Sequence, residues 1–125
     1  MERDALSREA DQMHAELCSA LADPRRIVAL YALAEKPRTV NELAAELNIT
    51  QPAASRHLKI LRDRGLVQAE RQGTCIEYRL ADRRLIEALD LLRSVLRENL
   101  AHRASLAATP SPNAVTPHER KETKR

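Results

Sequence analysis

The chain has 125 residues, which is enough for one small domain with a modest core and too few for two independent cores. Aromatic residues make up 2% of the chain, with no Trp or Phe, so Leu, Ile, Val and Ala must form the core, and such side chains favour packed helices. The formal net charge is only +3, yet basic side chains outnumber acidic ones between residues 48 and 72. This local excess favours a basic patch that binds a polyanionic partner over charge that serves solubility alone.

The first predicted element is an amphipathic helix over residues 4–22. Its apolar side chains recur at helical spacing, at Leu6, Ala10, Met13, Leu17 and Leu21. Asp23 and Pro24 then supply an N-cap and a proline at the first helical position, so a second helix is expected from there to about Glu35. The residues Lys36 and Pro37 end this helix.

Two further helices are predicted close together in the sequence. Thr39 and Glu42 form a capping box that begins the third helix. Thr50 caps the fourth helix, Pro52 lies in its first turn, and Gly65 ends it. The predicted buried faces are formed by Leu43, Ala44 and Leu47 in the third helix and by Ala53, Ala54, Leu58 and Leu61 in the fourth. Since only a few residues separate the two helices, they are expected to form a helix-turn-helix.

The spacing of apolar residues changes after Gly65. Residues 66–71 and 75–80 alternate apolar with polar side chains on either side of Gly73, which predicts a two-stranded hairpin, or wing. Asp82 is expected to cap a last helix whose leucines at positions 85, 89, 92, 96 and 100 form an apolar seam that requires a partner helix. The predicted fold class is therefore mainly α with a two-stranded β-wing, a winged helix-turn-helix.

One domain and one tail are expected. Residues 1–108 are predicted to form a winged helix-turn-helix domain for DNA binding and dimerisation. Residues 109–125 are rich in Pro, Ser and Thr and then in charge, so they cannot bury enough apolar surface to become ordered. We expect a disordered charged tail there.

The fourth helix keeps polar and basic side chains on its outer face, with His57 at the margin of that face. Gln and Arg form bidentate hydrogen bonds with base edges, whereas Lys and Arg neutralise phosphates. Base contacts are expected near the start of the helix, and wing residues are expected to reach a neighbouring backbone or minor groove. The predicted DNA-binding residues are Thr50, Gln51, Pro52, Ser55, Arg56, His57, Lys59, Arg62, Arg71 and Gln72. The alternative is that this charged face is merely solvated. The order of the predicted elements favours a DNA-binding surface instead.

These motifs resemble a known family. The segments LADPRRIVALYAL, TVNELAAELN, QPAASRHLKILRDRGLV and RQGTCIEYRL are similar to those of the winged-helix ArsR/SmtB transcriptional repressors, and the resemblance runs from about Ala15 into the last helix. It implies a homodimer held by the first and last helices, an operator with two-fold symmetry, and repression that an inducer relieves.

The inducer sites of that family are matched poorly. The arsenic-type sensors that resemble this fold carry an ELCVCD-type pair of cysteines before the recognition helix, and residues 40–48 contain no Cys. The zinc-type sensors carry Asp-x-His and His-x-x-Glu on the last helix, and residues 82–84 and 102–105 match neither half fully.

Two sensing sites remain as hypotheses. His14 and Cys18 share one face of the first helix and could bind a thiophilic metal or metalloid ion with His102 or Glu98 from the other subunit. The alternative is that Cys18 is a small buried hydrophobe and that His14 faces solvent. Cys75 is predicted on the outward face of its strand among basic neighbours, which favours modification of its thiol by oxidants, persulfides or arsenite. The alternative there is an incidental surface cysteine.

Other functions are disfavoured. No apolar run approaches the roughly 20 residues that span a bilayer, and residues 1–14 lack a signal-peptide core, so a cytoplasmic protein without a membrane partner is expected. In a reducing compartment Cys18 and Cys75 are expected to be free thiols. With no glycine-rich phosphate loop or catalytic triad, we predict no enzyme activity. The competing functions are a regulator with neither a metal nor a thiol inducer, and a protein-protein interaction module.

Overall fold

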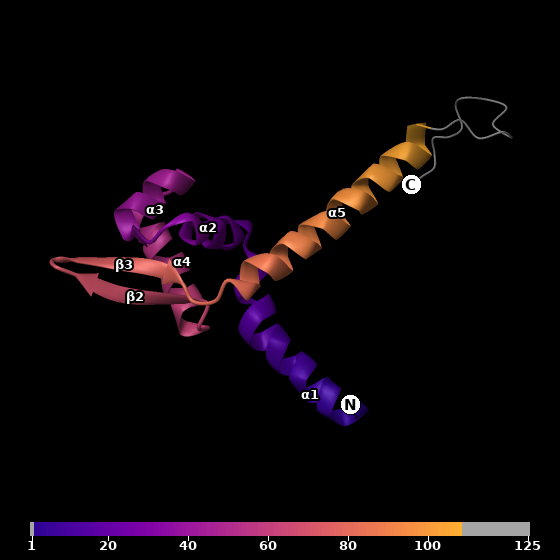
Figure 1. Ribbon diagram of the computed structural model, residues 1–125, viewed down its shortest axis with the longest axis horizontal. Helices are drawn as coiled ribbons and strands as arrows, with labels where there is room; N and C mark the ends of the chain where they lie inside the picture. The colour runs from indigo at the N-terminus through magenta and orange to yellow at the C-terminus, as the bar shows by residue number, and fades with distance from the viewer. Residues whose placement is uncertain (1, 109–125) are drawn as a thin grey trace, which may run out of the picture. The chain divides into compact units, whose positions relative to one another are not determined.

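The computed structural model describes residues 2–108, and the predicted tail at residues 109–125 lies outside them. The elements, in chain order, are α1 (Arg3–Met13), η1 (His14–Cys18), η2 (Ala20–Ala22), α2 (Pro24–Glu35), β1 (Arg38–Thr39), α3 (Val40–Leu47), α4 (Gln51–Asp63), β2 (Val67–Gln72), β3 (Cys75–Leu80) and α5 (Arg84–Ala108) (Figure 1). The chain divides into two compact units within α5, between Ala88 and Leu89. The helix-turn-helix and the wing belong to the first unit, and the fold is the winged helix-turn-helix that the sequence predicts.

The helices α2 and α3 begin at the capping residues that the sequence predicts. The Asp23 carboxylate accepts from the Arg25 backbone N–H at 2.8 Å at the start of α2, next to Pro24. At the start of α3, the Glu42 N–H donates to the Thr39 hydroxyl at 3.2 Å and the Thr39 N–H donates to the Glu42 carboxylate at 2.9 Å. These bonds satisfy backbone donors that have no partner within the helix, so the capping box is confirmed.

The turn between α3 and α4 depends on one left-handed residue. Asn48 ends α3 with φ 56°, a conformation that Asn tolerates better than most residues, and its N–H reaches the carbonyls of Ala44 and Ala45. Two residues later the Thr50 hydroxyl accepts from the Ala53 N–H at 3.2 Å and begins α4. The chain therefore reverses within a few residues, which gives the predicted helix-turn-helix.

The core of the first unit is aliphatic. Its largest fully buried side chains are Leu30 of α2, Leu43 of α3, and Leu58 and Leu61 of α4. Fully burying one such side chain stabilises a protein by about 1.5–3 kcal/mol, so these four residues fix how α2, α3 and α4 pack. The aromatic-poor composition is thus explained by a core of helices packed through leucine and alanine.

The sheet has one strand more than the sequence predicts. Its order is β1–β3–β2, with both pairs antiparallel, and Arg38 of β1 lies opposite Tyr78 of β3. The β2–β3 hairpin is the predicted wing, and Gly73 in its turn has φ 65° (Figure 1). A strand of two residues shows no alternation in the sequence, which is why β1 is absent from the prediction.

The predicted single helix over residues 4–22 is wrong in detail, because α1 passes into the π-helical turn η1 and the 3₁₀ turn η2. The Ser19 N–H bonds the His14 carbonyl at 3.0 Å, and the Ser19 hydroxyl bonds the Ala15 carbonyl at 2.6 Å. A serine hydroxyl bound to the carbonyl four residues earlier bends a helix, and here the backbone bond spans five residues. The segment remains helical but changes direction before α2.

The last helix begins as the sequence predicts. The Asp82 carboxylate accepts from the Arg84 N–H at 2.9 Å, and α5 then runs 25 residues. Within residues 2–108, every helix is too short or too polar to cross a membrane.

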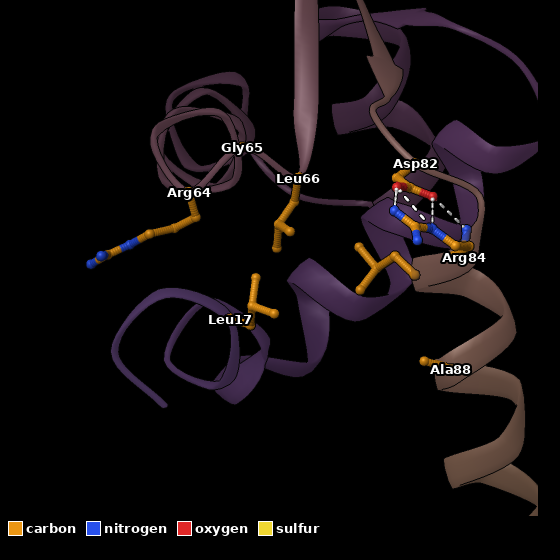
Figure 2. A pocket seen from close by; sticks show the side chains of 8 residues that line it. Leu17, Arg64, Gly65, Leu66, Asp82, Arg84 and Ala88 are labelled. Atoms are coloured by element: carbon orange, nitrogen blue, oxygen red, sulfur yellow. Dashed lines mark hydrogen bonds and ion pairs between the residues drawn. The ribbon is translucent and has the colours of Figure 1, made fainter. Parts of the chain in front are cut away.

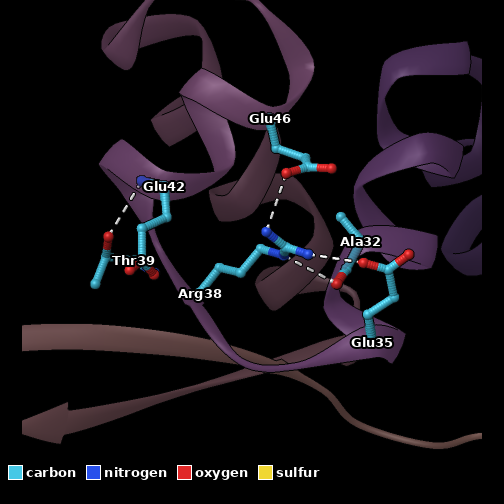
Figure 3. Close-up of polar contacts among 6 residues, drawn as sticks. All are labelled: Ala32, Glu35, Arg38, Thr39, Glu42 and Glu46. Atoms are coloured by element: carbon cyan, nitrogen blue, oxygen red, sulfur yellow. Dashed lines mark hydrogen bonds and ion pairs between the residues drawn. The ribbon is translucent and has the colours of Figure 1, made fainter.

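A buried arginine fixes the position of α3 against the end of α2. The Arg38 guanidinium donates to the Ala32 carbonyl at 3.1 Å, to Glu46 at 3.1 Å and to Glu35 at 2.8 Å (Figure 3). The side chain is buried, whereas both carboxylates are partly exposed. Because α3 leads directly into α4, this cluster also sets where α4 lies.

Arg38→Met is expected to lower the free energy of unfolding by about 2 kcal/mol, because hydrogen bonds to charged groups contribute about 1.5–3 kcal/mol and the Ala32 carbonyl would lose its donor. Urea denaturation followed by circular dichroism measures the change. Lys59→Met is the control, since the Lys59–Asp63 pair is exposed and such pairs contribute about 0.5 kcal/mol or less. Equal effects for the two variants would contradict the role of Arg38.

Candidate nucleic-acid interface

The outer face of α4 carries most of the predicted DNA-binding residues, and below this face is called the reading face. Burial of Ala54, Leu58 and Leu61 turns the opposite side of the helix to solvent. The residues of the predicted set that are exposed on α4 and at its N-cap are Thr50, Gln51, Pro52, Ser55, Arg56, Lys59 and Arg62. Their exposure agrees with the sequence, while their contacts with DNA stay a prediction.

The cations of this face are available to a polyanion. Lys59 bonds Asp63 at 3.1 Å, but its side chain is 75% exposed, so the ammonium can exchange that partner for a phosphate at little cost. Within the part of the chain that the structure describes, neither Arg56 nor Arg62 has a carboxylate partner. The face therefore presents one weakly paired cation and two unpaired ones.

The wing contributes exposed polar and basic groups beside this face. Arg71 and Gln72 are exposed near the end of β2, where they pair in register with Ile76 and Cys75 of β3. Further down the hairpin, Arg79 forms an ion pair with Glu70. The alternation of residues 75–80, with Cys75 outward, predicts that the next residue, Ile76, faces inward, but Ile76 is 41% exposed.

A shallow cavity of about 290 Å³ joins the wing to the helix-turn-helix. Its lining includes Asn41 of α3, Gln51 at the start of α4, and Cys75 of β3. Cys75 is exposed and free, as predicted, but the sequence gives no sign that it shares a hollow with Gln51. That proximity arises from the pairing of β1 with β3, which brings the hairpin to the start of α3.

The prediction that His57 lies on the outer margin of α4 is wrong. The residue is only 8% exposed, and the Arg26 guanidinium lies 3.2 Å from its Nδ1. The same guanidinium donates through Nε to the Ala20 carbonyl at 2.6 Å. A histidine at the edge of an amphipathic helix turns inward when a buried donor is available, and this donor comes from α2, 31 residues away in sequence.

Charge and burial around His57 favour a neutral ring. Burial lowers the pKa of the imidazole below its usual 6.5, Asp23 opposes that shift, and the cations Arg26, Arg25 and Arg56 add to it. The pKa of Asp23 is also lowered, chiefly by the hydrogen bond from the Arg25 N–H. The partly exposed Asp23 carboxylate and a neutral imidazole therefore flank Arg26 at neutral pH.

A second cavity, of about 430 Å³, lies at the turn between α4 and β2 (Figure 2). Leu17 and Leu66 face each other across it, while the Arg64 side chain extends away from them. At its rim Arg84 bonds Asp82 through both side chain and backbone and lowers the pKa of Asp82 to about 2. The Asp82 carboxylate, two residues before the start of α5, therefore stays ionised at ordinary pH.

The predicted metal residues do not form a cluster in the chain that is described. His14 and Cys18 are exposed at the two ends of η1, and His102 is exposed on α5. Among residues 2–108, no group of three or more His, Cys, Asp or Glu side chains is placed to hold a metal ion. Cys18 is exposed, so the alternative of a buried structural cysteine does not hold.

Comparisons with known proteins identify relatives of this fold. Residues 23–69 match the family described as bacterial regulatory protein, arsR family. The HTH-type transcriptional repressor SmtB of Mycobacterium tuberculosis is 46% identical over 78 residues, 62% of this chain and 58% of SmtB, so the chain spans little more than half of that relative. The biofilm growth-associated repressor of Agrobacterium fabrum is 39% identical over 99 residues, which cover 77% of this chain and 84% of that protein.

Among solved structures, this chain is similar to a homodimeric winged helix-turn-helix DNA-binding domain from Mycobacterium bovis. The TM-score is 0.69 at 34% sequence identity, and the match covers 81% of this chain and 93% of that chain.

Proposed function

Because the chain belongs to the ArsR family of bacterial regulatory proteins, we propose that it is a transcriptional repressor that binds operator DNA as a homodimer and is not an enzyme. The observation that carries the proposal is the outer face of α4, where Arg56 and Arg62 have no carboxylate partner among residues 2–108. A basic helix beside a wing that carries the exposed Arg71 matches the negative charge of B-DNA, whose major groove admits an α-helix.

Apolar surface on the outer helices supports the dimer. Leu92, Leu96 and Leu100 of the predicted seam are largely exposed on α5, as is Met13 on α1. Contiguous exposed apolar side chains on a helix mark an interaction surface, and a second copy of this chain is the occupant that a two-fold operator requires. In the proposed complex each α4 enters one of two successive major grooves.

The residues divide by role in this proposal. Gln51, Ser55 and Arg56 lie in the first part of α4 and contact base edges. Phosphates are contacted by the residues further along the helix and on the wing, namely Lys59, Arg62, Arg71 and Gln72. Thr50 and Pro52 shape the start of the helix and approach the backbone. His57 has no direct role in DNA contact.

A thiol signal is the inducer that the geometry supports best. Cys75 is exposed and lines the same cavity as Gln51, so an adduct on its sulfur would lie beside the first reading residue. A thiophilic metal or metalloid ion bound by His14 and Cys18, with His102 of the other subunit, is the second candidate. It is supported only by the spacing of His14 and Cys18.

Arg56→Ala is expected to weaken binding to the chain's own promoter DNA by about tenfold or more, because a bidentate contact with a base contributes about 1–3 kcal/mol. Fluorescence anisotropy measures the affinity, and sedimentation checks that the oligomeric state is unchanged. Lys59→Ala is the matched control, for which weaker binding to all sequences and a salt slope reduced by about one are expected. An unchanged affinity for Arg56→Ala would remove that residue from the reading set.

Replacing Leu92 and Leu96 together by Glu is expected to dissociate the dimer, because two carboxylates would be buried in an apolar interface. Sedimentation equilibrium measures the mass. Leu6→Glu, a single change on α1, should have a smaller effect. A double variant that remains dimeric would place the interface elsewhere.

The inducer is tested by measuring which compound releases the protein from DNA. Reduced, metal-free protein on promoter DNA is treated in turn with a persulfide donor, arsenite and zinc. Release by the persulfide donor that Cys75→Ser abolishes and Cys18→Ser preserves supports the thiol site, whereas the reverse pattern with zinc or arsenite supports the metal site. No release by any of them would leave a repressor without a thiol or metal inducer. Binding that salt does not weaken would instead indicate a protein-protein interaction module.

A further inference from the structure

Arg26 connects three segments that are separate in the sequence. Its guanidinium donates through Nε to the Ala20 carbonyl at 2.6 Å and through Nη2 to the Ser19 carbonyl at 3.4 Å, and its Nη1 lies 3.2 Å from Nδ1 of His57. Asp23 completes the set, with its carboxylate 4.0 Å from the same Nη1. The side chain of Arg26 is largely buried. One side chain therefore joins the end of the N-terminal helical segment to α4.

The contact between Arg26 and His57 requires one form of the imidazole. A guanidinium has five N–H donors and no acceptor, so Nδ1 of His57 must carry the lone pair. The ring is then neutral, with its hydrogen on Nε2. A proton on Nδ1 would replace the acceptor by a donor and would place a second positive charge against Arg26.

The charges around His57 do not neutralise that second charge. Three cations surround it: Arg26 and Arg25 of α2, and Arg56 of its own helix. Among residues 2–108, the one anion that acts on the ring is Asp23, at the N-cap of α2, which also accepts the Arg25 N–H at 2.8 Å. Protonated His57 would thus be a buried cation with more repulsion than attraction.

We infer that His57 is a positioning residue for the reading helix, and that its protonation breaks the link through Arg26 to the N-terminal segment and weakens DNA binding. This inference rests on the proposed function. As the pH falls, the unfolded chain takes up this proton before the folded chain does, because burial lowers the pKa of His57 in the folded state. The stabilisation is complete above the unfolded pKa of about 6.5 and declines below it.

The direction of the pH effect separates this role from direct DNA contact. A histidine that touched DNA would gain a positive charge at low pH and bind phosphates more tightly. A buried positioning histidine predicts the opposite, a loss of affinity at low pH. The other three histidines of the chain, His14, His102 and His118, are replaced by Asn in the test protein, so that His57 is its one histidine.

The first measurement needs no DNA. Nitrogen-15 NMR of the imidazole rings in the full-length protein with the other three histidines replaced is expected to show an unprotonated Nδ1 and a protonated Nε2 at pH 7.5. The titration midpoint should lie below 6.5. A proton on Nδ1 at pH 7.5, or a midpoint at or above 6.5, would overturn the inference whatever the protein does with DNA.

The second measurement is affinity for the chain's own promoter DNA at pH 7.5 and pH 5.5, by anisotropy at constant salt. The test protein should lose about fivefold or more of its affinity at the lower pH, the usual size of a coupling between two sites. In His57→Asn an amide oxygen takes the place of Nδ1 as an acceptor that does not titrate, and the pH dependence should disappear. No binding at either pH would overturn the proposed function and this inference with it, whereas pH-independent or tighter binding at pH 5.5 would overturn the inference alone.

Arg26→Gln provides a second variant if His57→Asn does not fold. It removes the nearby positive charge but keeps an N–H donor, so the NMR midpoint of His57 should rise and the loss of DNA affinity should begin at a higher pH. Circular dichroism at pH 7.5 checks the fold. A midpoint that does not move would show that Arg26 does not act on His57.

Discussion

One row of side chains on α4 is buried in the core, and this burial determines which residues of the helix face outward. Leu58 and Leu61 are fully enclosed, and Ala54 is small enough to let the start of the helix approach the core closely. With a rotation of 100° for each residue, fixing these positions fixes Ser55, Arg56, Lys59 and Arg62 on the exposed side. The face that we propose contacts DNA is therefore a consequence of core packing, and a change of register in α4 would bury cations and expose leucines.

Polar contacts support that packing: those of the buried Arg38, and the caps of the helices. Arg38 holds the end of α2 against α3, and the capping box at Thr39 follows it directly, so one short segment sets both the position and the start of α3. The left-handed Asn48 and the Thr50 cap then set the start of α4. Because these contacts involve neighbouring residues, the angle between α3 and α4 is built from local chemistry on top of a shared apolar core.

Local chemistry is also what could be predicted from the sequence. The caps at Asp23, Thr39 and Thr50 depend on bonds within three residues, and each occurs where the sequence indicates it. The features that could not be predicted depend on distant partners. His57 turns inward because of Arg26, 31 residues away, and the hollow shared by Gln51 and Cys75 exists because β1 pairs with β3. The π-helical turn η1 is accompanied by a hydrogen bond from the Ser19 hydroxyl to the Ala15 carbonyl, which the apolar periodicity does not predict.

These distant contacts connect the surfaces that a repressor must coordinate. The N-terminal helical segment carries exposed apolar residues such as Leu6 and Met13, and it ends at the carbonyls of Ser19 and Ala20 that Arg26 holds. The same guanidinium contacts α4 through His57. The segment also packs into the core through the buried Ala20, and Glu16 pairs with Arg64 at the end of α4, so Arg26 adds a polar contact with α4 to these. Since Nδ1 of His57 accepts a hydrogen bond only while the imidazole is neutral, the contact depends on protonation in a way that a leucine contact at the same place would not.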